Sequence, residues 1–333
     1  AISAIAAGNT VVIKPSEISN NTSKILAELI NSNFDKKHLF IIEGGVETTT
    51  ELLQQKWDKI FFTGSTPVGK IVYKAAAENL TPVTLELGGK SPTFVLADCN
   101  IKITAKRIVW AKFLNAGQTC IAPDYLLVEK KIETKVLEAL KKEIQEFYPL
   151  SENINENYVQ IVNERNFNRL KQLITTDRIY YGGETIIENR SIAPTLLQNI
   201  SFEDNIMQDE IFGPILPVIA FENLDEVIAK VKKREKPLAL YIYSKSKKTI
   251  QKILHEISFG GGAINESLVH LSNPNLPFGG VGASGIGNYH SKAGFDTFTH
   301  YKSILHKTSW FEPNIKYTPF TKLKKKILKF LLE

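Results

Sequence analysis

One of the two cysteines of this 333-residue chain lies in a context that suits a reactive thiol. The apolar run 109–114 predicts a buried helix, Gly117 then loosens the backbone, and Pro123 ends the stretch. Cys120 therefore lies at a turn, where a thiolate could meet a substrate. The alternative is an inert cysteine that only packs. Cys99 has no glycine nearby and is interpreted as structural.

Two glutamates are candidates for polar roles in the same chemistry. In LELGGK, strand alternation points Leu85 and Leu87 to one face and Glu86 to the other. Glu86 is then either exposed or held in a pocket, where burial would raise its pKa and make it a general base. In QDEIFGP, Glu210 and Phe212 could hold a sugar and a flat ring, or the phenylalanine could only pack.

Two stretches near the N-terminus suit a nucleotide. In FFTGSTPVGK, Gly64 and Gly69 frame a strand-to-helix turn whose free N–H groups could hold a phosphate. The spacing is G-x-T-x-x-G, however, and an ordinary turn would also explain it. In VVIKPSE, Lys14 and Glu17 follow a strand, where they either hold a ribose or lie in a solvated turn.

The elements that must position these side chains alternate in the first third of the chain. This alternation predicts a parallel sheet covered by helices, with a ligand at the carboxyl ends of the strands. The predicted strands are 9–15, 38–45, 59–65 and 82–89, and the predicted helices are 22–32, 47–55 and 66–79. Later strands are expected at 92–97, 124–130 and 238–244, with helices at 131–147 and 163–174.

Composition narrows the class of protein. Apolar residues make up 43% and charged residues 23%, which is typical of a globular protein. The net charge is +6, but the lysines are spread widely, so no nucleic-acid partner is expected. Two cysteines favour a reducing compartment, and no apolar run approaches the roughly 20 residues of a membrane span, so we expect a cytoplasmic protein. The scattered histidines show no ligand spacing, and no metal is predicted.

Taken together and in order, these stretches resemble the signatures of the aldehyde dehydrogenase superfamily. The motifs are KPSE, FTGST, ELGGK, GQTC, EIFGP and PFGGVGASGIG, and the resemblance covers residues 1 to about 310. Finer details such as NAGQTCIAPDY resemble the class 3 branch, which acts on aromatic, medium-chain and fatty aldehydes. The resemblance implies an α/β fold with a partial Rossmann-type sheet, a second α/β catalytic domain and a C-terminal oligomerisation strand.

The resemblance also assigns a role to each candidate residue. Cys120 would be the nucleophile that forms a thiohemiacetal and then a thioester, and Glu86 would be the general base. The adenosine ribose would be held by Lys14 and Glu17, the pyrophosphate by Gly64, Ser65 and Gly69, and the nicotinamide ribose and ring by Glu210 and Phe212. Like charge at Glu17 disfavours a 2′-phosphate, so NAD is expected, with NADP possible.

The resemblance further implies limits and alternatives. The family's oxyanion asparagine would lie before Ala1, so the chain is expected to lack an N-terminal part and to be impaired alone. A catalytically silent fragment is therefore the alternative function. Transfer of the thioester to coenzyme A is a further alternative, against which Glu86 argues. The predicted domains are 1–87 for the cofactor, 88–285 for catalysis, 286–310 for return and oligomerisation, and 311–333 as a basic tail.

The last forty residues suggest two partners. Residues 295–305 alternate apolar and polar side chains, which predicts a strand that needs a neighbour to pair with. In the family that the chain resembles such a segment crosses to another subunit, so the resemblance implies a homodimer. In 321–333, Leu323, Ile327 and Leu331 recur every fourth residue with lysines off that stripe. This pattern predicts a basic amphipathic helix that either touches a membrane surface, peripherally and weakly, or docks on the protein.

Overall fold

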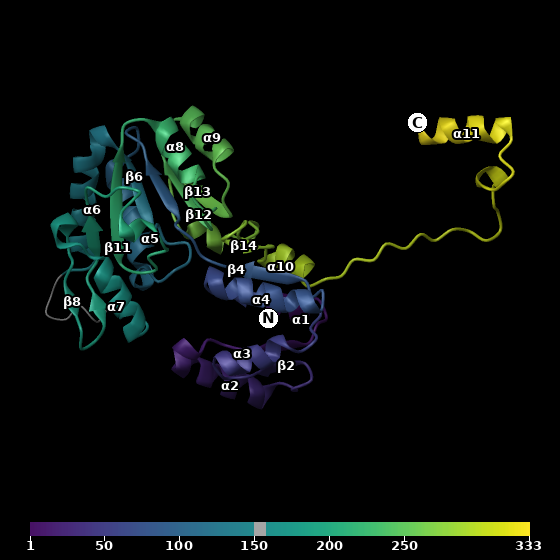
Figure 1. Ribbon diagram of the computed structural model, residues 1–333, viewed down its shortest axis with the longest axis horizontal. Coiled ribbons are helices and arrows are strands. Elements are labelled where there is room, and N and C mark those ends of the chain that lie inside the picture. Colours follow the sequence, from purple (N-terminus) through teal and green to yellow (C-terminus); the bar gives the residue numbers. More distant parts are fainter. Residues whose placement is uncertain (150–157) are drawn as a thin grey trace. The chain divides into compact units, whose positions relative to one another are not determined.

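The computed structural model describes residues 1–149 and 158–333. Its contacts divide the chain into two compact units, Ala1–Thr299 and His300–Glu333, and each is described by itself. Figure 1 shows the elements of both units.

The predicted alternation of strands and helices is present in the first third of the large unit. Strand β1 pairs in parallel with β2, and β3 pairs in parallel with β4, so the expectation of parallel pairing is confirmed. The elements are α1 (Ile2–Ala6), β1 (Val11–Ile13), α2 (Asn20–Asn33), β2 (Leu39–Ile41), α3 (Val46–Leu53), β3 (Ile60–Thr63), α4 (Thr66–Glu78) and β4 (Val83–Glu86).

A seven-stranded sheet follows, in the order β13-β12-β5-β6-β11-β10-β7, and only the β10–β7 pair is antiparallel. Its elements are β5 (Pro92–Val95), α5 (Ile101–Phe113), β6 (Tyr125–Glu129), α6 (Glu133–Phe147), α7 (Glu164–Leu173), β7 (Ile179–Tyr181), β10 (Thr195–Leu197), β11 (Ile215–Phe221), α8 (Leu224–Lys232), β12 (Ala239–Tyr243), α9 (Lys247–Glu256) and β13 (Gly261–Ile264). A small antiparallel hairpin, β8 (Thr185–Ile186) with β9 (Ser191–Ile192), comes between β7 and β10 in the sequence.

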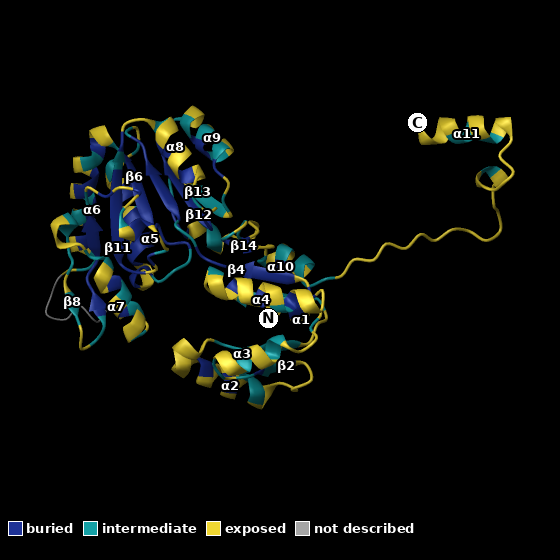
Figure 2. Cartoon of the chain, viewed as in Figure 1, coloured by how far each residue is buried: buried dark blue, intermediate teal, exposed yellow. Residues whose placement is uncertain are grey.

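The core of the large unit lies on this sheet. Strands β5, β6 and β12 are buried along nearly their whole length, as continuous apolar strands covered on both faces should be. They are dark blue in Figure 2, while the outer faces of the covering helices are yellow. A second, smaller apolar cluster packs α4 against β4. The two clusters divide the chain between Leu87 and Phe94, but the domain limits named above stay predictions.

The chain then returns to the first sheet. Strand β14 (Gly285–Ile286) pairs antiparallel with β4, which places Gly285 opposite Glu86. Helix α10 (Ser291–Thr297) follows it.

The predicted strand at 295–305 does not begin where expected, because its first three residues are helical; the pairing of 300–305 with a second subunit stays a prediction. Residues up to Thr297 belong to α10, where Lys292 and Asp296 form an i,i+4 ion pair at 2.6 Å, and 300–307 have no regular structure. The alternation Phe295, Thr297, Thr299 was ambiguous, because Phe295 and Phe298 also have the i,i+3 spacing of a helix. No strand of this chain pairs with 300–307 among the described residues.

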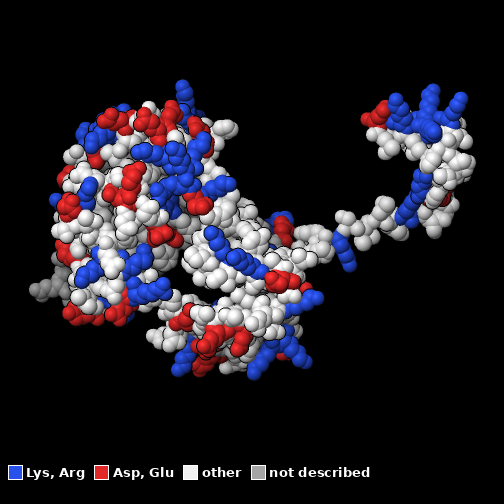
Figure 3. All heavy atoms as spheres, viewed as in Figure 1, with Lys and Arg blue, Asp and Glu red and all other residues white. Residues whose placement is uncertain are grey.

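The small unit contains one short 3₁₀ turn, Asn314–Lys316, and helix α11 (Lys322–Leu332). The Thr321 side chain caps α11 by accepting a hydrogen bond from the Lys324 N–H at 3.3 Å, so the predicted helix is present. Figure 3 shows lysines gathered along one edge of this helix. Among the described helices, none has the length and apolar character needed to cross a membrane.

Candidate active site

The cysteine loop is strained and firmly held. After α5, Asn115, Ala116 and Gly117 all have left-handed φ angles, of 54°, 51° and 70°. Such a conformation costs about 1–3 kcal/mol for each non-glycine residue and persists where neighbours hold it in place. The Gln118 side chain accepts from the Val162 N–H at 2.9 Å, and the buried Tyr241 hydroxyl donates to the Ile121 carbonyl at 2.7 Å. Cys120, between these two anchors, is half-buried.

Gly117 brings this loop against the bend at 210–213. A Cβ atom on Gly117 would lie 2.3 Å from the carbonyl oxygen of Gly213, which is inside any possible contact distance. Two segments that the sequence separates by about ninety residues therefore touch through glycines. Only glycine satisfies both the φ angle and the close approach at this position.

Glu86 is buried, so the exposed alternative is wrong. It ends β4 and is 3% exposed, and neither carboxylate oxygen has a hydrogen-bond partner among the described residues. Burial raises the pKa of Glu86 to about 8. An unpaired buried carboxylate of this kind is costly for a fold and is a frequent property of functional sites.

Glu210 lies on the glycine pair that follows Glu86. A Cβ on Gly88 would meet Glu210 Oε2 at 2.0 Å, and the Gly89 N–H donates to the Glu210 carboxylate. Burial raises the pKa of Glu210 to about 8, with Asp124 adding to the effect. The Glu210 carboxylate thus packs directly against Gly88 and Gly89 of LELGGK, which we call the seat of Glu210.

The structure brings Cys120 within electrostatic reach of both glutamates. Burial, followed by Glu210 and Glu86, raises the pKa of the Cys120 thiol to about 11. The thiol is therefore neutral near pH 7. The Glu86 carboxylate, when ionised, is a candidate base for this thiol; because its pKa is below that of the thiol, the proton transfer is uphill and must be drawn forward by attack of the sulfur on a substrate. Cys99 is also half-buried, and burial raises its pKa too, but the carboxylate that acts on it, Asp98, is already bonded to Ser244 and the Lys245 N–H.

The expected nucleotide-binding residues occupy strand ends in the first part of the unit. Lys14 Nζ donates to Glu17 Oε2 and to the Gly44 carbonyl, both at 2.9 Å, and this contact lowers the pKa of Glu17. Ser65 precedes α4 as its N-cap, yet its side chain makes no capping hydrogen bond. The nucleotide-binding stretch is linked to the cysteine site through the backbone, because the Gly64 N–H donates to the Glu86 carbonyl at 3.0 Å.

The neighbouring glycines are required by packing. A Cβ on Gly69 would lie 2.6 Å from the Leu87 side chain, so α4 can approach β4 closely only with glycine there. A Cβ on Gly64 would lie 2.5 Å from the Phe62 ring. The spacing G-x-T-x-x-G therefore presses the start of α4 onto the sheet, which exposes its N–H groups to a ligand.

Comparison with known proteins decides the family. Residues 1–304 match the model of the aldehyde dehydrogenase family. The chain belongs to this family. It therefore is an oxidoreductase of the aldehyde dehydrogenase type, with the Rossmann-like α/β fold of that family and NAD(P)-dependent aldehyde oxidation as its general activity.

Individual relatives agree with the class 3 resemblance. The chain is 49% identical to the 4,4′-diaponeurosporen-aldehyde dehydrogenase of Staphylococcus aureus, covering 96% of this chain and 70% of that protein. It is 47% identical to aldehyde dehydrogenase family 3 member A2 of Rattus norvegicus, covering 99% and 69%. It is also 47% identical to the dimeric NADP-preferring aldehyde dehydrogenase of Rattus norvegicus, covering 92% of this chain and 68% of that protein.

Solved structures give the same result. The substrate-bound state of Staphylococcus aureus AldH superposes with a TM-score of 0.97 at 48% identity, covering all of this chain and 73% of that one. A Mycobacterium tuberculosis aldehyde dehydrogenase complexed with NAD⁺ superposes with a TM-score of 0.82 at 29% identity, covering 93% and 67%.

The residues present fit the family's dinucleotide. Ser65 has a free hydroxyl at a helix start, and the Glu210 carboxylate rests on glycines that leave no room for a side chain. Phe212 is 39% exposed at the same bend. No group of three or more potential metal ligands occurs in the described part of the aldehyde dehydrogenase chain.

Two residues near the thiol were not found from the sequence. Burial, followed by Glu86 and Cys120, raises the pKa of Tyr289 to about 12, so its hydroxyl faces the same site. Lys112 is 1% exposed, and burial lowers its pKa to about 8 near Asp124 and Glu210. Neither has a local sequence signal, because Lys112 lies within a helix and Tyr289 lies 169 positions after Cys120.

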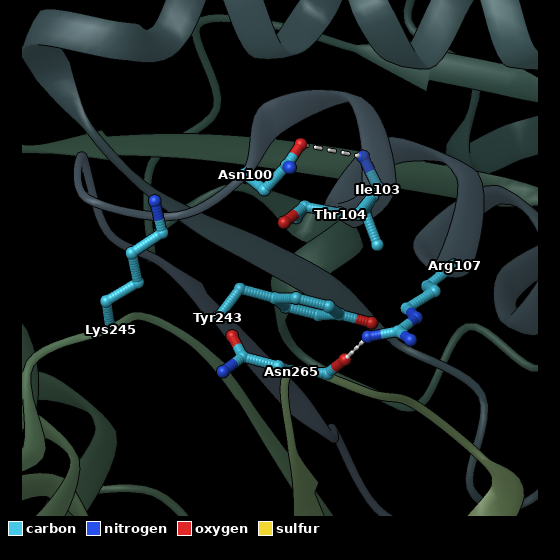
Figure 4. Close-up of a pocket in the computed structure, with 7 residues that line it drawn as sticks. All are labelled: Asn100, Ile103, Thr104, Arg107, Tyr243, Lys245 and Asn265. Atoms are coloured by element: carbon cyan, nitrogen blue, oxygen red, sulfur yellow. Dashed lines mark hydrogen bonds between the residues drawn. The ribbon is translucent and has the colours of Figure 1, made fainter.

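A hollow of about 150 Å³ lies elsewhere in the aldehyde dehydrogenase fold (Figure 4). Its lining follows the carboxyl ends of β5, β12 and β13, whereas Cys120 precedes β6 and so lies toward the opposite edge of the parallel sheet. Arg107 in this hollow pairs with Glu266 at 3.2 Å and donates to the Asn265 carbonyl. The hollow is therefore separate from the cysteine site.

Proposed function

We propose that this aldehyde dehydrogenase oxidises aldehydes through a covalent intermediate on Cys120. The supporting observation is the buried Glu86 carboxylate, which has no hydrogen-bond partner among the described residues and lies close enough to Cys120 to act on the thiol electrostatically. Glu86 takes the thiol proton, and Sγ attacks the aldehyde carbon to form a thiohemiacetal. NAD(P), when bound, accepts the hydride that leaves this carbon.

Glu86 acts a second time when the thioester is hydrolysed. Glu86 first releases the thiol proton to solvent, and its carboxylate then removes a proton from the water that attacks the thioester carbonyl. The acid leaves as the C–S bond breaks, and the Cys120 thiolate takes the proton back from Glu86. This step distinguishes hydrolysis from transfer to coenzyme A. An unpaired base beside the sulfur supports hydrolysis.

The cofactor would be held in two halves. We assign the adenosine ribose to Lys14 and Glu17, the pyrophosphate to Gly64, Ser65 and Gly69 at the start of α4, and the nicotinamide ribose and ring to Glu210 and Phe212. Glu17 is exposed and ionised, with its pKa lowered by Lys14, so it repels a 2′-phosphate and favours NAD.

The test is mass spectrometry of the enzyme mixed with an aromatic or medium-chain aldehyde and NAD. We expect an acyl adduct on the peptide that contains Cys120, and we expect Cys120→Ser to abolish both adduct and NADH formation while NAD binding is kept. Cys99→Ser is the matched control and should behave as wild type. Normal turnover by Cys120→Ser would overturn the mechanism.

We propose a homodimer as the assembly. A relative of 47% identity is named as dimeric, and helix α4 leaves the apolar side chains of Val68, Ile71 and Tyr73 exposed, with Ile71 at 61%. Sedimentation of a stable monomer at micromolar concentration would contradict this.

A further inference from the structure

Three charged side chains hold the backbone of 206–211, the segment that carries Glu210. Lys90 Nζ donates to the carbonyls of Ile206 at 2.9 Å and Asp209 at 2.8 Å. Asp124 Oδ1 accepts from the Ile211 N–H at 2.9 Å. Arg169 donates to the Ile211 carbonyl at 2.7 Å and, more weakly, to the Glu210 carbonyl at 3.4 Å. We call Lys90, Asp124 and Arg169 the backbone clamp.

Lys90 and Asp124 of the clamp are buried, and every donor of the Lys90 ammonium has a hydrogen-bond acceptor. Lys90 and Asp124 form an ion pair at 2.5 Å, and their side chains are only 9% and 5% exposed. The three N–H bonds of the Lys90 ammonium are matched by one carboxylate and two carbonyls. Buried ion pairs contribute little net stability, because desolvation offsets their attraction, so their best use is to fix a geometry.

The clamp ties together the three segments of the site. Lys90 directly follows the Gly88–Gly89 seat of Glu210, Asp124 lies four residues after Cys120, and both bind the segment that ends at Ile211. One ion pair thus fixes the distance between the seat of the Glu210 carboxylate, the nucleophile loop and the Glu210 backbone.

The backbone conformation of Phe212 indicates that the segment is held in place from both sides. Its φ of 47° is left-handed, which is strained for a phenylalanine. The residue before it, Ile211, has its N–H bound by Asp124 and its carbonyl bound by Arg169, so the chain cannot relax on that side. On the other side, Gly213 touches Gly117.

We propose that Lys90, Asp124 and Arg169 are positioning residues that place Glu210 and Phe212 for the nicotinamide half of the cofactor. The inference rests on the proposed role of Glu210. The clamp touches no part of the adenosine-binding residues Lys14, Glu17 and Ser65, so it should affect one half of the cofactor and leave the other unchanged.

The test compares binding of NAD⁺ with binding of ADP, which has the adenosine and pyrophosphate but lacks the nicotinamide ribose and ring. The readout is the ratio of the two dissociation constants in the wild-type protein and in Lys90→Met, Arg169→Met and Glu210→Gln. We expect the preference for NAD⁺ over ADP to fall about tenfold in the clamp variants, as when one charge-assisted hydrogen bond is lost. A merely destabilised protein would weaken both ligands together.

Further variants keep the test decisive. Lys90→Met leaves Asp124 buried and unpaired, so the double variant Lys90→Met/Asp124→Leu removes both charges and should fold with the same loss of preference. Arg169→Met removes a half-buried side chain that binds the Glu210 and Ile211 carbonyls of the same segment, and Arg169→Lys should restore part of the preference. The control is Lys130→Met, which breaks an exposed ion pair with Glu133 and should leave the ratio unchanged.

Each outcome decides between the two ideas. If Glu210→Gln lowers the preference and the clamp variants keep it, the clamp is overturned while the proposed role of Glu210 stands. If Glu210→Gln keeps the preference for NAD⁺ over ADP, the proposed role of Glu210 is wrong, and so is the positioning role of the clamp.

Discussion

At the scale of single residues, the Glu86 carboxylate should control the pH dependence of thioester hydrolysis. Its pKa of about 8 means that the basic form increases as pH rises toward 8, so the hydrolysis rate should rise about tenfold per pH unit below that value and then level off. In Glu86→Gln we expect this rise to disappear and the acyl-enzyme to accumulate, with a rate about 10²–10⁴-fold lower. Rapid-quench mass spectrometry of the Cys120 peptide measures both.

The control is Glu210→Gln, which removes a neighbouring carboxylate with the same raised pKa. If hydrolysis in Glu210→Gln keeps its pH rise, Glu86 is the base. The same rise persisting in Glu86→Gln would remove Glu86 from this step.

Glu17 should set the choice of cofactor. Its exposed carboxylate accepts from Lys14 at 2.9 Å, so a 2′-phosphate placed there would meet a negative charge. In Glu17→Gln we expect kcat/KM with NADP to rise relative to NAD, by about tenfold for one removed like charge near the surface. Steady-state kinetics with both cofactors is the measurement, and Glu47→Gln on α3 is the control. An unchanged ratio would place the 2′-hydroxyl elsewhere.

At the scale of elements, the contact between the cysteine loop and the 210–213 bend should tolerate no side chain. We expect Gly117→Ala to lose both folding stability and turnover, because Gly117 combines a φ of 70° with a Cβ position 2.3 Å from Gly213. Gly8→Ala is the matched control, since Gly8 has a φ of 83° but open space around its Cβ. That control should lose only the backbone cost, about 1–2 kcal/mol in urea denaturation, with normal activity.

A loss of stability in Gly117→Ala no greater than in Gly8→Ala would mean that the loop or the bend shifts easily. The two segments would then be independent, and the strain at Ala116 and Phe212 would need another cause.

The sequence predicted elements and site residues wherever the signal is local. The apolar runs of β1 to β4 and the periodic apolar residues of the helices between them depend on neighbours in the chain, and Cys120 and Glu86 were found from nearby glycines. The start of the strand predicted at 295–305 is wrong, because an alternation of a few residues does not exclude a helix of two turns. The backbone clamp could not be predicted from the sequence, because its contacts join distant positions. Lys90 lies 34 positions before Asp124 and 119 positions before Asp209, whose carbonyl it binds.

At the scale of the whole molecule, α11 should bind an anionic lipid surface. One face of the helix carries Leu323 and Phe330, 68% and 84% exposed, and Lys324 bends away to donate to the Tyr317 carbonyl. Lysines 322, 325, 326 and 329 occupy the opposite arc. We propose that this end of the chain makes the protein peripheral to a membrane, and no described residue range contains a spanning helix.

Vesicle sedimentation tests the tail. We expect binding to vesicles that contain phosphatidylserine, and replacing Lys325, Lys326 and Lys329 by Gln should weaken it about a hundredfold, at about 1 kcal/mol per lysine. Neutral phosphatidylcholine vesicles and a triple substitution of Lys230, Lys232 and Lys233 on α8 are the controls. Equal loss in both triple variants would show a general charge effect and no role for α11.

The raised pKa values of Glu86 and Glu210 make the stability of the folded protein depend on pH. Glu86 and Glu210 hold their protons up to about pH 8 when folded, but lose them near pH 4.3 when unfolded. Between these values the folded state binds more protons, so the free energy of unfolding should fall as pH rises, by about 1.4 kcal/mol per unit for each group. Heat inactivation should accordingly be slower at pH 6 than at pH 7.5, and the difference should shrink in Glu86→Gln. Resistance to heat inactivation would then be greatest near pH 6, whereas thioester hydrolysis would be fastest near pH 8. The enzyme should therefore be stored at the lower pH and assayed at the higher one.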